Sequence, residues 1–277
     1  MSLRTVFLCV DALVKASAIR CQALCACLFN GAIRGLDFSD RIYHHMCMSK
    51  LIKILLDTAN IQVIKEITEN YPIDGVTTNP SVLAKECDNV EDTLISISKI
   101  IGENRFLHVQ TTATAAAEMF AQAKKMKSAF GTNFHVKIPI TEQGLKAITM
   151  CKNADINVTA TAIFTPMQAL LAAQGGADYV APYINRIDNI VSDGVDVVAH
   201  IAKLFSVQDV NTRILAASFK NVQQVYGTVV NGAHAVTISG ELCKELLFHP
   251  YTDKSLDDFR SDWEKKFGKH EITDFIR

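Results

Sequence analysis

The chain has 277 residues, which is enough for one large domain or two small ones. Apolar residues make up 49% of it and charged residues 21%, so it can bury a full core and does not have the composition of a disordered protein. The net charge of −1 argues against a nucleic-acid-binding or polybasic membrane role, and no apolar stretch approaches the length of a membrane-spanning helix.

Residues 1–47 differ from the rest of the chain. Five of the eight cysteines lie there, and charged residues interrupt any signal-peptide core. We interpret this segment as an arm that is disordered or precedes the native start, at Met46 or Met48; the alternative is a targeting or interaction arm. The three later cysteines are scattered, which favours reduced thiols and a cytoplasmic protein.

From residue 51 onward, strand-like and helix-like segments alternate. The expected strands are Ile52–Leu56, Gly75–Thr78, Phe106–Gln110, Phe134–Ile138, Ile156–Ile163, Asp178–Ala181, Arg213–Ala217 and Ala235–Ile238. The clearest expected helices are Ile61–Asn70, Ala113–Ala129, Glu142–Lys152, Pro166–Gln174 and Val195–Phe205. Eight such repeats in roughly 220 residues predict a (β/α)8 barrel. We therefore assign residues 48–277 to one barrel domain, with an extra amphipathic C-terminal helix at Ser255–Phe267.

A doubly wound sheet is the alternative architecture. It would normally carry a glycine-rich phosphate loop after its first strand, and residues 57–60 (Asp-Thr-Ala-Asn) contain no glycine. The barrel therefore fits better.

Lys137 is the most informative residue, because it interrupts an apolar, β-branched run. Lysine is rarely buried, so its presence in such a strand needs a reason. Burial disfavours the charged form of a lysine, and a neutral amine adds to carbonyl groups to form Schiff bases. Taken alone, an edge-strand lysine or one whose stem reaches solvent is the more ordinary explanation.

The other predicted strands also end in polar residues. Barrel enzymes place their chemistry at the C-terminal ends of the strands. The candidates there are Asp57, Thr77, Asn79, Gln110, Lys137, Thr161, Tyr183, Arg186 and Ser218. Taken singly, these residues also have purely structural explanations. For example, Asp57 could cap a helix, Asn79 could be a turn residue, and Arg186 could form a surface ion pair with Asp188. Together they suit carbonyl chemistry on a hydroxylated, phosphorylated substrate.

The chemistry suggests roles for these groups. Lys137 would form an iminium with a ketone, which stabilises a carbanion at the next carbon. Tyr183 would move protons directly or through a water held by Gln110 and Thr161. Asp57 would orient the substrate hydroxyls, and Arg186 would bind a phosphate. No cluster of His, Asp or Glu has metal-ligand spacing, so a metal-dependent aldolase is less favoured; a non-catalytic sugar-phosphate binder would not need a buried amine.

Four short sequence motifs resemble those of one known family. They are Leu56-Asp57-Thr58-Ala59-Asn60, Gly75-Val76-Thr77-Thr78-Asn79-Pro80-Ser81, Val136-Lys137-Ile138-Pro139 and Ala216-Ala217-Ser218-Phe219-Lys220. They look like the small transaldolase/fructose-6-phosphate aldolase family over about residues 50–268. The resemblance implies a Schiff-base barrel with its lysine at Lys137, no metal or organic cofactor, and an active site of Asp57, Asn79, Gln110, Thr161, Tyr183, Arg186 and Ser218.

Two positions bear on the branch of the family. Transaldolases usually have Glu and Phe where this chain has Gln110 and Tyr183, so the chain resembles the aldolase branch. The implied reaction is reversible cleavage of fructose 6-phosphate, or a related ketose phosphate, to dihydroxyacetone and glyceraldehyde 3-phosphate. The alternative is a transaldolase that moves the three-carbon unit between sugar phosphates. The resemblance also implies a homo-oligomer, a pentameric ring or a decamer, with neither nucleic acid nor membrane as a partner.

Overall fold

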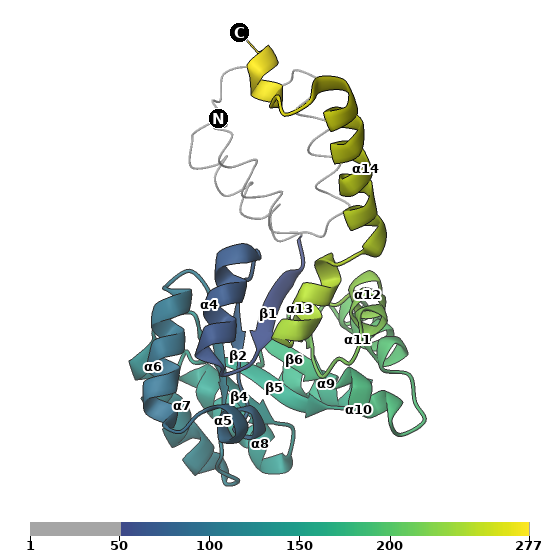
Figure 1. Cartoon of the computed structure of the whole chain (residues 1–277). Helices are drawn as coiled ribbons and strands as arrows, with labels where there is room; N and C mark the ends of the chain where they lie inside the picture. The colour runs from purple at the N-terminus through teal and green to yellow at the C-terminus, as the bar shows by residue number, and fades with distance from the viewer. Residues whose placement is uncertain (1–50, 277) are drawn as a thin grey trace, which may run out of the picture. The chain divides into compact units, whose positions relative to one another are not determined.

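Short runs of apolar and β-branched residues form a closed barrel of eight parallel strands in the computed structural model, which describes residues 51–276 (Figure 1). The strands are β1 (Lys53–Asp57), β2 (Gly75–Thr77), β3 (Phe106–Gln110), β4 (Phe134–Pro139), β5 (Asn157–Ile163), β6 (Tyr179–Pro182), β7 (Arg213–Ala216) and β8 (Ala235–Ile238). Each pairs with its neighbour in sequence, and β8 returns to β1 with Lys53 opposite Ala235. The predicted (β/α)8 barrel is confirmed.

Helices follow the strands and surround the barrel. They are α4 (Ile61–Asn70), α5 (Pro80–Glu86), α6 (Val90–Ile101), α7 (Ala116–Phe130), α8 (Glu142–Asn153), α9 (Pro166–Gln174), α10 (Ile184–Asp188), α11 (Gly194–Val207), α12 (Val222–Val230), α13 (Gly240–Leu247) and α14 (Pro250–Phe267), with a 3-10 turn at Ile272–Phe275. The expected arm, residues 1–47, lies outside the described residues.

Two helix starts were predicted wrongly. Helix α14 begins at Pro250 rather than Ser255, because the side chain of His249 accepts a hydrogen bond from the Tyr251 amide and Pro250 occupies the first turn. Helix α7 begins at Ala116 rather than Ala113, because Gln122 Oε1 accepts hydrogen bonds from the amides of residues 112 and 113 and holds them outside the helix. The contact from Gln122 leaves no local sequence pattern, whereas Pro250 is a helix-start signal that the predicted boundary at Ser255 left unused.

The alternation of side chains along each strand divides the core into two parts. Outward residues such as Val76, Phe134 and Ile214 are buried between the sheet and the helices. Inward residues such as Leu55 and Leu215 fill the barrel itself. Side chains two residues apart on a strand therefore stack along the barrel axis, and polar residues near the strand ends reach the two openings.

Helix caps set the turns that leave the C-terminal ends of the strands. Asn60, Asn79, Thr141 and Thr165 each accept a hydrogen bond from an amide in the first turn of the following helix. The register of β5 shifts next to β6, and Ala162 takes a positive φ of 59° there. Such bulges re-aim side chains next to active sites.

Among the described helices, none combines the length and apolarity needed to cross a membrane. Helix α14 contains no buried residue. The only tryptophan of the sequence, Trp263, packs on the tail itself: its ring centroid lies 4.6 Å from that of Phe267, and its Nε1 donates to the His270 carbonyl at 2.7 Å.

Candidate active site

A cavity of about 360 Å³ opens at the C-terminal ends of the strands, where barrel enzymes place their chemistry. Its walls bring together most of the predicted site residues. It is lined by Asp57, Asn79, Pro80, Ser81, Gln110, Lys137, Pro139, Ala162, Tyr183, Arg186, Ala217 and Ser218. The remaining two predicted residues, Thr77 and Thr161, hydrogen-bond to side chains in this wall.

Lys137 lies on β4 with its side chain inside the barrel. The residue is only 4% exposed, and the strand register places it between Gln110 on β3 and Thr159 on β5. Its Nζ donates to the Thr78 carbonyl oxygen at 2.9 Å. The amine is thus held at the cavity by a neutral acceptor and forms no ion pair with a carboxylate of the described chain.

Asp57 is the last residue of β1, and a hydrogen bond from the neighbouring strand β2 fixes its carboxylate. Its Oδ1 accepts a hydrogen bond from Thr77 Oγ1 at 2.7 Å, and Thr77 Oγ1 is also 2.7 Å from Thr237 Oγ1. Asn60, rather than Asp57, caps the following helix. The helix-cap reading of Asp57 therefore does not hold, and its second carboxylate oxygen is left for the cavity.

Tyr183 follows β6 and is oriented by three contacts. Its hydroxyl lies 2.9 Å from Thr161 Oγ1, its ring meets Phe164 edge-on at 5.9 Å, and the Arg186 guanidinium lies 5.0 Å from the ring centroid. The suggested ion pair between Arg186 and Asp188 is absent from the described residues. Asp188 instead accepts hydrogen bonds from the Gly194 amide and from Gln224 Nε2.

Two further predicted residues sit at the cavity rim. Asn79 does serve as a cap, because its Oδ1 accepts from the Val82 amide at 3.0 Å; its amide nitrogen stays available. Ser218 lies beyond β7 with a positive φ of 63°, and its carbonyl accepts from the Asn185 amide at 2.8 Å. A non-glycine residue in this conformation is strained, which is frequent at binding sites.

A family model described as transaldolase/fructose-6-phosphate aldolase matches residues 54–274. The chain belongs to this family. A probable fructose-6-phosphate aldolase of Streptococcus pneumoniae is 37% identical over 213 residues, which is 76% of this chain and 96% of that protein. A probable transaldolase of Halalkalibacterium halodurans is 37% identical over 215 residues, which is 78% of this chain and all of that protein. A probable transaldolase of Geobacillus kaustophilus is 35% identical, with 78% of this chain covered and all of that protein.

Among solved structures, a flavocytochrome b2 variant with bound sulfite superposes with a TM-score of 0.52 at 9% sequence identity. The match covers 69% of this chain and 57% of that structure. This similarity concerns the barrel fold alone. The family assignment instead rests on the aldolase and transaldolase relatives, and it makes this chain an enzyme of the aldolase/transaldolase type.

Sequence reasoning missed one residue that supports the site of this family member. Glu86, at the end of α5, accepts hydrogen bonds through Oε2 from Thr58 Oγ1 at 2.7 Å and from the Ala59 amide at 2.8 Å. It thereby holds the turn that follows Asp57. Glu86 lies 28 positions from Thr58, and no local pattern links the two.

Two histidines also lie inside the barrel, closer than Lys137 to the N-terminal ends of the strands. The rings of His108 and His135 stack with centroids 4.5 Å apart, and His108 Nδ1 is 2.9 Å from Thr159 Oγ1. Burial, together with the neighbouring His135 and Lys137, holds the pKa of His108 well below its usual value. Burial lowers the pKa of His135 to about 4, despite the nearby carboxylate of Asp178. Both rings are therefore neutral near pH 7. Within residues 51–276, no group of three His, Cys, Asp or Glu side chains is arranged to hold a metal ion.

Proposed function

We propose that the protein is a Schiff-base aldolase that cleaves fructose 6-phosphate, or a close relative, to dihydroxyacetone and glyceraldehyde 3-phosphate, and that also runs in reverse. The observation that carries the proposal is the buried amine of Lys137 in one cavity with the phenol of Tyr183, the carboxylate of Asp57 and the guanidinium of Arg186. The relative from Streptococcus pneumoniae, named a probable fructose-6-phosphate aldolase, supports the substrate.

The reaction follows from these groups. The amine of Lys137 adds to the ketone carbon C2, and loss of water gives an iminium. A base removes the proton of the C4 hydroxyl, the bond between C3 and C4 breaks, and its electron pair enters the iminium to form an enamine. Glyceraldehyde 3-phosphate leaves, C3 takes a proton, and water hydrolyses the iminium to free dihydroxyacetone and Lys137.

Each neighbouring residue has one proposed role. Tyr183, with Thr161, moves the protons; Gln110 holds the water that takes part. Asp57, held by Thr77, orients the substrate hydroxyls, with Asn79 and Ser218 as further hydrogen-bonding groups at the rim. Arg186 binds the phosphate through its planar fork of donors.

A direct test of the mechanism is trapping. Incubation with dihydroxyacetone and sodium borohydride should add one reduced three-carbon unit, and peptide mapping should place it on Lys137. Lys137→Met should abolish both the adduct and cleavage, while Lys146→Met, which alters an exposed lysine of α8, should change neither. An adduct on another lysine, or none at all, would refute the mechanism. Activity should also survive excess chelator.

The same assay tests the branch of the family. Fructose 6-phosphate cleavage is measured with and without erythrose 4-phosphate. An aldolase releases dihydroxyacetone without the acceptor aldehyde, whereas a transaldolase needs it. Dependence on the acceptor would favour the transaldolase activity for which the relatives from Halalkalibacterium and Geobacillus are named.

We also propose that the protein acts in the cytoplasm as a homo-oligomer, a ring of five or a pair of such rings. Helix α14 supports an oligomer, because it exposes Tyr251, Leu256 and Phe259 by more than half of their surface. Three exposed apolar side chains on one helix form a candidate contact surface. Three cysteines of the described chain, Cys87, Cys151 and Cys243, are unpaired, which supports a reducing compartment.

A further inference from the structure

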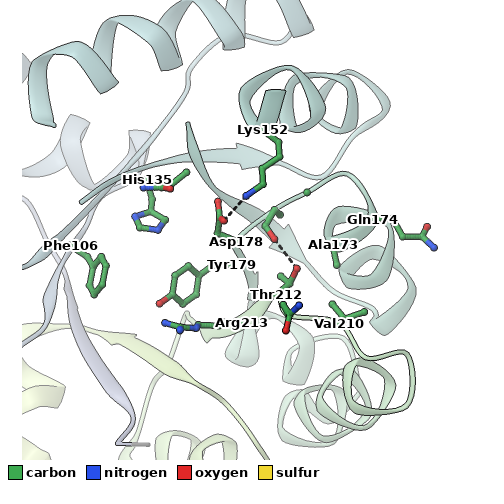
Figure 2. A pocket seen from close by; sticks show the side chains of 14 residues that line it. Phe106, His135, Lys152, Ala173, Gln174, Asp178, Tyr179, Val210, Thr212 and Arg213 are labelled. Carbon is green, nitrogen blue, oxygen red and sulfur yellow. Dashed lines mark hydrogen bonds and ion pairs between the residues drawn. The ribbon is translucent and has the colours of Figure 1, made fainter. Parts of the chain in front are cut away.

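A second and larger cavity lies at the opposite end of the barrel from the reactive face of Lys137. Its volume is about 560 Å³. It is formed by residues at the starts of β3 to β7, by the turns that precede β6 and β7, and by the last turns of α8 and α9. Figure 2 labels Phe106, His135, Asp178 and Arg213 among its lining residues. We call it the lower pocket. A volume of this size suits a small organic molecule rather than a single water or simple ion.

Two almost fully buried aromatic residues, His135 and Tyr179, line the lower pocket. His135 is 6% exposed, and its Nδ1 has no hydrogen-bond partner in the described chain. Tyr179 is 5% exposed, and its hydroxyl makes no hydrogen bond within residues 51–276. The Nδ1 atom of His135 is enclosed by protein atoms, whereas the Tyr179 hydroxyl is not among the fully enclosed polar atoms, so the hydroxyl is the group that can meet a ligand.

The charge of the lower pocket is positive. Lys152 and Asp178 face each other at 3.1 Å, and the second oxygen of Asp178 accepts from the Val158 amide at 2.8 Å. This carboxylate is therefore satisfied. Arg213, at the start of β7, forms no ion pair with any carboxylate of residues 51–276. Its guanidinium, on the same side of the pocket as the Tyr179 hydroxyl in Figure 2, is the remaining charge.

Three rings form the apolar wall. Phe106 meets His135 edge-on with centroids 5.6 Å apart, and His135 meets Tyr179 edge-on at 5.5 Å. Because the pKa of His135 is lowered to about 4, this ring is neutral and does not add to the charge near pH 7. Aromatic walls with one fixed cation favour a ligand that has a ring or planar body and an anionic end.

We propose that the lower pocket binds a small organic anion with a planar body, whose phosphate or carboxylate group pairs with Arg213 and accepts a hydrogen bond from Tyr179. The alternative is that these residues have only a structural role and close the N-terminal opening of the barrel, its floor. A floor residue would gain most by pairing inside the protein. Tyr179 and Arg213 instead both line the cavity, beside the ion pair of Lys152 with Asp178, and Arg213 has no carboxylate partner within residues 51–276.

The test is isothermal titration calorimetry on the full chain with three probes of similar shape: phenyl phosphate, benzoate and neutral phenol. At least one of the two anions should bind roughly tenfold or more tightly than phenol, and the stronger of the two tells whether the natural group is a phosphate or a carboxylate. Arg213→Gln should weaken that anion by about tenfold or more. Tyr179→Phe, which keeps the ring and so the packing, should weaken it by about two- to tenfold.

Arg186→Ala is the matched control. It removes a cation from the cavity that holds Lys137 at the C-terminal ends of the strands, which we call the upper cavity, and leaves the lower pocket intact. Binding of the probe should stay within about twofold of the unmodified protein. The proposal fails if neither anion is preferred over phenol, if Tyr179→Phe and every folded Arg213 variant bind as before, or if Arg186→Ala alone removes the signal. None of these results depends on aldolase activity, so this pocket and the proposed function can fail separately.

Discussion

At the scale of the residue, Tyr183 is the group on which the proposed branch of the family depends. Among the described residues its hydroxyl has one hydrogen-bond partner, Thr161, and the residue lines the upper cavity. A phenol in this place can deliver the proton that turns the enamine into free dihydroxyacetone. Without that proton, the enamine persists until a second aldehyde arrives. In the proposed mechanism, the Tyr183 oxygen therefore separates hydrolytic release from transfer.

Tyr183→Phe should reduce cleavage in the absence of an acceptor by roughly 10²-fold or more, the usual effect of losing a general acid/base. Transfer to erythrose 4-phosphate should fall less, or rise. The measurement is the ratio of the two rates in one preparation, with Tyr226→Phe, an exposed tyrosine of α12, as the control. A parallel fall in both rates would make Tyr183 a structural part of the wall, and no change would place the proton donor elsewhere.

The buried histidines predict a pH dependence of stability. An unfolded histidine takes up its proton near pH 6.5, whereas the pKa of His135 in the folded protein is about 4. Between these values the unfolded state binds the extra proton, so the free energy of unfolding falls as the pH falls. The loss begins below about pH 6.5 and approaches 3 kcal/mol for His135 alone near pH 4 (~1.4 kcal/mol per pH unit). The pKa of His108 is shifted in the same direction and adds to it.

Chemical unfolding at pH 7, 6 and 5 checks this expectation. His135→Gln cannot take up the proton, so its free energy of unfolding should decline with pH about 1.4 kcal/mol per unit less steeply below pH 6. His200→Gln alters an exposed histidine of α11 and should keep the original slope. Equal slopes in all three proteins would show that burial does not lower the pKa of His135.

The sequence predicts which side chains gather at the upper cavity but not all of their contacts. Asp57, Gln110 and Lys137 are inward-facing positions near strand ends, and alternation along a strand assigns them to that opening. The position of Ser218 depends on a strained turn, and the support from Glu86 depends on a contact between distant segments. Their catalytic roles, in turn, stay predictions until the variants are assayed.

At the scale of the element, the turn between β4 and α8 lies directly after the strand that holds Lys137. Gly144 in the first turn of α8 packs against the end of β4: a Cβ atom there would overlap the backbone carbonyl oxygen of Pro139. Backbone cannot move aside as a side-chain tip can. The Gly144 amide also donates to the cap residue Thr141 at 2.9 Å, which fixes the approach of helix and strand.

Gly144→Ala should therefore destabilise the protein by about 1–3 kcal/mol through overpacking, and disturb the alignment of Lys137. Thermal unfolding and the rate of borohydride trapping measure the two effects. Lys146→Ala, an exposed position on the same helix, should change stability by less than about 0.5 kcal/mol. A Gly144→Ala protein as stable as the parent would mean that α8 shifts freely along β4.

Element boundaries were predictable where a cap or a glycine marks them. Helix α4 and strand β3 match their predicted ranges, because Asn60 and the alternation of residues 106–110 are clear signals. The start of α14 was missed because histidine is an uncommon cap, although Pro250 in the first turn is a helix-start signal. The lower pocket was not predictable either, because Tyr179 and Arg213 look like ordinary residues of separate strands until the barrel closes.

At the scale of the whole molecule, helix α14 is a long helix that contains no buried residue. It has 18 residues, and its apolar side chains include Tyr251 and Phe259, at 69% and 68% exposure. An isolated helix of this length is only marginally stable in water, so contact with another surface would stabilise it. A neighbouring copy of the chain is the partner proposed above.

A chain that stops after His249 should therefore have a lower mass by light scattering than the full chain. Phe259→Ser should weaken the assembly in the same direction, because it removes apolar area from the exposed face. Lys254→Ser, a polar position on the same helix, should leave the mass unchanged. A monomeric parent protein, or a truncated chain of undiminished oligomeric mass, would contradict the proposed role of α14.

The pairing of β1 with β8 makes the order of the segments along the chain partly arbitrary. Ile54 lies opposite Val236, and Lys244 of α13 pairs with Glu66 of α4. The first and last strand–helix units of the barrel are therefore neighbours in space. A short linker from residue 248 to residue 52, with new termini opened at the turn after α8, would preserve every strand pairing while removing α14. Such a circular permutant should fold and still form the adduct on Lys137, since a ring of strands has no inherent first member.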